Sequence, residues 1–115
     1  MFHRIVAGYF DSDAITSRRE LVVTRPINIE VVRRLIDEFG FPAVDGTYSV
    51  GSETLTVHRG YVDCPWLGMG VNATSVKFLL RLGEETNCMF ADLGHGEVVT
   101  EDVLRRSIED LDWTY

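Results

Sequence analysis

Long apolar runs and cysteines are scarce in this sequence of 115 residues. No run approaches the ~20 apolar residues that a membrane-spanning helix needs. The first residues reach a charged side chain at Arg4, before the apolar core that a secretory signal requires. The two cysteines, Cys64 and Cys88, are too few for a disulfide framework and are expected to be reduced. These absences predict a cytoplasmic protein that makes no contact with a membrane.

The sequence also lacks the short motifs that accompany catalysis and the binding of metals or nucleotides. Gly68 and Gly70 are not followed by the lysine and hydroxyl residue of a phosphate-binding loop. Asp11 and Asp13 resemble the opening of a calcium loop, but Val22 stands where the bidentate glutamate is required. We therefore expect no metal and no cofactor, and a binding role is favoured over catalysis.

Basic residues are outnumbered, with eleven lysines and arginines against eighteen acids and a net charge of −7. The acidity is concentrated in residues 72–115, which carry nine acids and four bases. Residues 1–25 differ, because they carry four arginines and three acids. A negative field repels nucleic acid and attracts basic proteins. We expect no nucleic-acid partner and a basic protein partner.

The length and the hydrophobic content of 45% suit a single folded domain over residues 1–115. Two segments space their apolar residues three and four apart, which predicts amphipathic helices at about 28–39 and 100–111. Asn28 and Thr100 are suited to cap their first turns, and Gly40 is suited to end the first helix.

The remaining apolar segments favour strands at residues 2–10, 19–24, 46–50, 54–62 and 88–92. Residues 74–82 fit either structure, because Val76, Leu79 and Leu80 would share a helix face. Val76, Phe78, Leu80 and Leu82 occupy alternate positions, with Lys77 and Arg81 between them, and we favour a strand. About six strands and two helices without regular alternation predict an α+β fold, with both helices on one face of a mostly antiparallel sheet.

Large aromatic residues near acids indicate a protein-binding surface, since aromatic side chains anchor many interfaces. One group lies between Tyr61 and Met69, a segment that includes most of an expected loop over residues 64–70, and the other lies near the C-terminus. The candidate partner-binding residues are Tyr61, Trp66, Met69, Glu109, Asp110, Asp112 and Trp113. The leading hypothesis is an acidic domain that neutralises or regulates a basic protein, as the immunity protein of a bacterial toxin system does. The alternative for these residues is closure of the core.

A second hypothesis is a small-molecule-binding domain or minor enzyme. Asp92, His95 and Glu97 lie in a glycine-rich turn, where carboxylates could orient an exposed imidazole. His58 and Cys64 would join this site only if folding brings them close, because a reactive thiol needs a neighbouring base. A third hypothesis is a homo-oligomer formed through an exposed sheet edge.

Overall fold

The computed structural model describes residues 2–50, 53–67 and 73–106. Within these residues the chain forms eight strands, three helices and a further helical turn over residues 101–106. The strands are β1 (Phe2–Phe10), β2 (Val23–Arg25), β3 (Ala43–Val44), β4 (Thr47–Val50), β5 (Glu53–Val57), β6 (Val62–Leu67), β7 (Met89–Asp92) and β8 (Glu97–Val99). The helices are α1 (Ser12–Thr16), α2 (Ile29–Phe39) and α3 (Ala73–Thr86).

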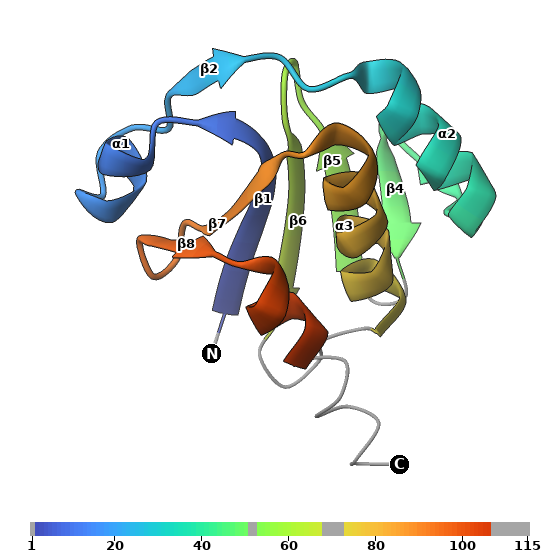
Figure 1. Ribbon diagram of the computed structural model, residues 1–115. Helices are drawn as coiled ribbons and strands as arrows, with labels where there is room; N and C mark the ends of the chain where they lie inside the picture. Colours follow the sequence, from blue (N-terminus) through green and yellow to red (C-terminus); the bar gives the residue numbers. More distant parts are fainter. Residues whose placement is uncertain (1, 51–52, 68–72, 107–115) are drawn as a thin grey trace.

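The strands form one sheet in the order β3-β4-β5-β6-β1-β7-β8, and β2 pairs with the end of β1 (Figure 1). Every pair of neighbours is antiparallel. This arrangement confirms the predicted α+β class. The predicted strand count was too low, since β3 and β8 are only two and three residues long. Strands this short show no readable alternation.

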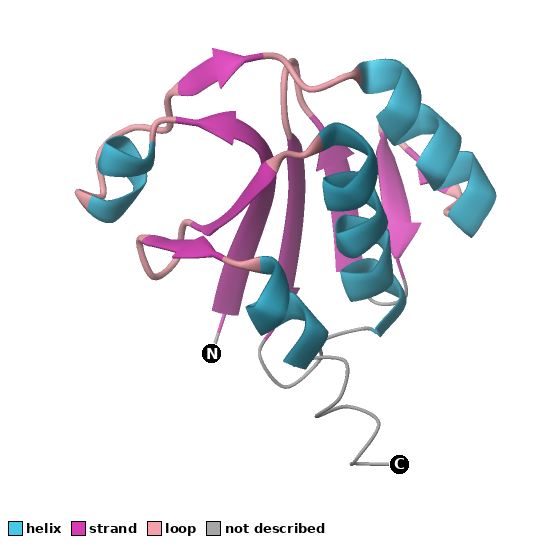
Figure 2. Cartoon of the chain, in the orientation of Figure 1, coloured by secondary structure: helices cyan, strands magenta, loops and turns pink. Residues whose placement is uncertain are grey.

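β1 lies at the centre of the sheet and buries both of its faces. Ile5 and Ala7 pack into the main core beneath α2 and α3. Val6 and Phe10 point to the opposite face, where Ile15 of α1 covers them. Figure 2 shows α1 at one end of the sheet and the longer helices at the other. Successive residues of a strand face opposite ways, so one strand supplies both cores.

The helix predicted at residues 28–39 is confirmed. The side chain of Asn28 accepts a hydrogen bond from the amide of Glu30 at 3.1 Å, which caps the first turn. Gly40 ends α2 in the left-handed conformation at φ +72°. Val32, Leu35 and Ile36 are buried in the core. The second predicted helix begins as expected, because Thr100 caps residues 101–106, and its later residues lie outside the described part.

The strand predicted at residues 74–82 is wrong, because this segment belongs to α3. The helix packs against the sheet and also against α2, so it buries a broad arc of its surface. Phe78, Leu79 and Leu82 are all fully buried. Apolar residues therefore occupy adjacent and alternate positions in this helix, and the alternation is the same as that expected for a strand. The residues after this segment, up to Thr86, complete the last turn of α3.

The segment that follows β1 and part of an expected loop also have regular structure. Asp11 caps the short helix α1, with its side chain accepting from the amide of Asp13 at 3.0 Å. Residues 64–67, placed in a loop by the sequence, form the second half of β6. Among the described residues, no helix has the length and apolar character needed to cross a bilayer.

Gly83 in α3 allows a close contact with the ring of Phe90 on β7. A Cβ atom at position 83 would lie 2.9 Å from the ring's Cζ atom. We expect Gly83→Ala to destabilise the fold by about 1 kcal/mol, because overpacking outweighs the gain in helix propensity. In a Phe90→Leu background the same substitution should stabilise the protein. Urea unfolding of the four proteins measures both changes, and a stabilising Gly83→Ala in the unmodified chain would contradict this packing.

Candidate binding pocket

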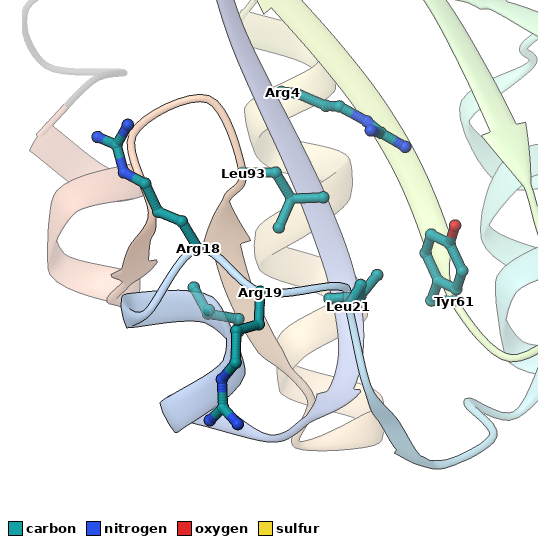
Figure 3. A pocket seen from close by; sticks show the side chains of 7 residues that line it. Arg4, Arg18, Arg19, Leu21, Tyr61 and Leu93 are labelled. Carbon is teal, nitrogen blue, oxygen red and sulfur yellow. The ribbon is translucent and has the colours of Figure 1, made fainter.

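A pocket of about 270 Å³ opens on the sheet face opposite α2 and α3. Its floor is apolar and combines Ile15 of α1, Leu21 of the following segment and Leu93 at the end of β7. Arg4 of β1 and Tyr61 of the β5–β6 connection stand on one side (Figure 3). The stems of two further arginines complete the lining. The full set is Arg4, Ile15, Arg18, Arg19, Leu21, Tyr61 and Leu93.

Arg4 is held in place by Asp63 on the neighbouring strand β6. Its Nε and Nη2 atoms donate to Oδ2 of Asp63 at 2.9 and 2.7 Å. Asp63 is only 8% exposed, whereas the arginine side chain reaches solvent. The hydrogen bond with Asp63 is the main cause that raises the pKa of Arg4 above its ordinary value. Arg4 therefore presents a fixed positive charge at the pocket.

His58 and Tyr61 support this ion pair from the β5–β6 connection. The two rings stack with centroids 4.6 Å apart, and Nε2 of His58 lies 3.7 Å from Oδ2 of Asp63. Tyr61 also contacts the edge of Phe10. The other oxygen of Asp63, Oδ1, is buried and has no hydrogen-bond partner among the described residues. The carboxylate is thus held mainly through one oxygen.

Arg18 and Arg19 follow α1 at the opposite side of the pocket. Arg18 takes a left-handed backbone conformation with φ +55°, and its Nη2 donates to the carbonyl of His95 at 3.3 Å. Figure 3 shows the two guanidinium groups directed away from each other, so their stems line the pocket. The residues that line the pocket include three arginines and no acid, although Asp63 pairs with Arg4. This local balance is opposite in sign to the charge of the whole chain.

The five residues predicted for a ligand site do not line this pocket. Cys64 is fully buried in the main core, on the face of β6 opposite Asp63 and His58. Asp92 is also buried, and it accepts hydrogen bonds from the amide of Gly94 and from Nδ1 of His95 at 3.0 and 2.8 Å. The structure therefore separates His58 from Cys64, and Asp92 and His95 stabilise a turn.

Glu97 is exposed on the edge strand β8. The other cysteine, Cys88, is half-buried beyond α3, and burial raises the pKa of its thiol, which disfavours the reactive thiolate. Among the described residues, no group of three His, Cys, Asp or Glu side chains is arranged to hold a metal ion.

Tyr61 is the one predicted partner-binding residue whose side chain the structure describes, and it lines the pocket. Trp66 belongs to β6, where its backbone pairs with His3 of β1. The remaining predicted residues, Met69, Glu109, Asp110, Asp112 and Trp113, lie outside the described residues.

The helices carry acids that are matched by arginines. Arg81 of α3 donates to Glu38 of α2 at 3.0 Å, and Arg34 of α2 binds Glu85 of α3. Arg105 contacts two further acids, one on α3 and one in its own helical turn. The outer surface of α2 and α3 therefore does not form a continuous negative patch in the described part of the chain.

Arg4, Arg18 and Arg19 belong to no motif that the sequence predicts as a site. The one signal for them is that residues 1–25 hold more bases than acids in an otherwise acidic chain. Comparisons of this chain with models of protein families, with curated proteins and with solved structures give no match. The pocket must therefore be interpreted from its own chemistry.

The Arg4–Asp63 pair can be tested by a double-mutant cycle. Arg4→Gln should destabilise the protein by about 1–3 kcal/mol, because it leaves the buried Asp63 carboxylate without its main partner. Asp63→Asn in the same chain should recover part of this loss, giving a coupling energy of about 1–2 kcal/mol. Urea unfolding at neutral pH measures the four stabilities, and additive losses would contradict the pairing.

Proposed function

We propose that this chain is a small-molecule-binding domain whose ligand occupies the pocket between the α1–β2 segment and β1. The observation that carries the proposal is an apolar floor of Ile15, Leu21 and Leu93 beside the polar groups of Arg4 and Tyr61. Ligand pockets are usually concave and mostly apolar, with a few polar groups that orient the ligand. The volume of about 270 Å³ suits a ligand built around a single ring.

The proposed role is binding without catalysis. The residues that line the pocket include no cysteine, serine, histidine or carboxylate, which are the usual nucleophiles and general bases. We place this activity in the cytoplasm. Cys64 and Cys88 are not joined by a disulfide, which suits a reducing compartment.

A panel of neutral and charged single-ring compounds tests the proposal by ¹H–¹⁵N NMR. Ligands should shift the amides of Leu21, Tyr61 and Leu93 together. Leu21→Trp should abolish binding by filling the pocket, whereas Val44→Trp, a similar change at an exposed site on β3, should not. Equal binding by the two variants, or shifts confined to other residues, would refute the proposal.

A basic protein partner is the second candidate function, in which the chain neutralises or regulates that protein. The supporting observation is that Glu97 with Val98, and Asp102 with Val103, are exposed at β8 and the helical turn after it. The two valines are 40% and 47% exposed. Among the described residues, neither acid forms a salt bridge. Acids beside exposed apolar groups suit a partner that carries both cationic and apolar side chains.

This candidate is tested by capture from lysate with the unmodified chain and two charge variants. Glu97→Gln/Asp102→Asn should lose a basic protein that the unmodified chain retains at low salt and releases at high salt. Glu30→Gln/Asp37→Asn removes the same charge from α2 and should retain it. Loss of the same protein by both variants would show that total charge, not this surface, governs capture.

A further inference from the structure

We propose that the ligand of this pocket is a carboxylate attached to a small apolar body, and that the side chain of Arg4 binds the carboxylate. This inference rests on the proposed function and names the class of its ligand. Three observations support it: the pairing of Arg4 with Asp63, the charged residues that line the pocket, and the separation of polar from apolar side chains within the pocket.

The pairing with Asp63 leaves one side of the Arg4 guanidinium available. A guanidinium has five N–H groups, and Nε and Nη2 each use one of them on the same oxygen of Asp63. The two N–H groups of Nη1 and the second one of Nη2 have no acceptor among the described residues. Because the guanidinium is planar, one N–H of Nη1 and the remaining one of Nη2 are parallel and point away from the side-chain stem, the geometry that binds the two oxygens of a carboxylate.

Asp63 also holds this outward pair in position before a ligand arrives. An exposed arginine usually loses side-chain entropy when it binds an anion. Here the Asp63 bonds, supported by the stacked rings of His58 and Tyr61, already restrict the side chain. The ligand therefore gains hydrogen bonds to an ionised group at a reduced entropic cost.

The charge around the pocket favours an anion over a cation or a neutral ligand. Arg4, Arg18 and Arg19 all line the pocket, and no acidic side chain does. Figure 3 shows Arg4 extending toward the side of Tyr61 that carries the hydroxyl group. This hydroxyl is a further donor on the same side of the pocket.

The apolar floor determines what is attached to the carboxylate. Ile15, Leu21 and Leu93 offer no hydrogen-bonding side chain, so they favour an aliphatic or aromatic body over a sugar or a nucleotide. Arg4 and the floor lie on different parts of the same pocket. A ligand must therefore be amphipathic to contact both.

Benzoate and benzamide test this assignment, because they share a ring and differ in charge. Affinities are measured by ¹H–¹⁵N NMR titration at low salt, with phenyl phosphate as a third probe. We expect benzoate to bind at least about tenfold more tightly than benzamide, since a hydrogen bond to a charged group contributes about 1.5–3 kcal/mol. If phenyl phosphate exceeds benzoate by a similar factor, the carboxylate assignment is wrong and the anion is a phosphate.

Variants of Arg4 show whether this residue makes the distinction. Arg4→Lys keeps the charge but loses the planar pair of donors, and it should weaken benzoate binding by about tenfold. Arg4→Gln/Asp63→Asn keeps a neutral pair and should remove the preference for benzoate over benzamide. Arg33→Gln, which removes an exposed arginine from α2, is the matched control and should leave both affinities unchanged.

Three results would overturn the assignment. They are equal affinities for benzoate and benzamide, unchanged benzoate binding in both Arg4 variants, and the absence of benzoate binding at millimolar concentration. The proposed function is tested separately. If neutral ring compounds shift the amides of Leu21 and Leu93, the pocket binds small molecules even though the carboxylate assignment is wrong. If no probe shifts these amides, both proposals are wrong.

Discussion

The burial of both faces of β1 is the constraint on which the rest of the structure depends. Ile5 and Ala7 enter the core beneath α2 and α3, while Val6 and Phe10 enter the smaller core beneath α1. Pairing with β6 and β7 fixes the register of β1, and a shift of one residue would exchange the two sets of side chains. The same register places Arg4 on the face where Asp63 points outward. The core and the pocket therefore arise from one alternation of side chains.

α2 buries one side, and its structure can be predicted from the sequence. α2 has one apolar stripe, a capping Asn28 and a terminal Gly40, and each signal is local to the chain. α3 is buried toward both the sheet and α2, so its apolar pattern no longer distinguishes a helix from a strand. β6 contains Pro65, which cannot donate to a neighbouring strand. The register of β5 with β6 covers only Val62 and Asp63, so the missing donor at Pro65 is tolerated.

The candidate site is harder to predict, because its residues come from four separate segments. Sequence reasoning selects residues by reactive type, which led to His58, Cys64 and His95. The pocket is instead made of arginine, leucine and isoleucine side chains that have ordinary roles in most proteins. Only Tyr61 belongs to both the predicted and the observed sets. Had β6 been recognised as a strand, its alternation would have separated Cys64 from Asp63 and directed attention to the carboxylate.

The net charge of the chain and the charged side chains at the pocket act on different molecules. At physiological salt the field of the whole chain is screened beyond about 8 Å, so it acts mainly on large partners during approach. At the pocket itself, the lining residues are three arginines without an acid, and Asp63 pairs with one of them. A negative protein can therefore bind a small anion at one site while its exposed acids favour a cationic partner at another. In the proposed function, the charges at the pocket, and not the net charge of −7, would select the ligand.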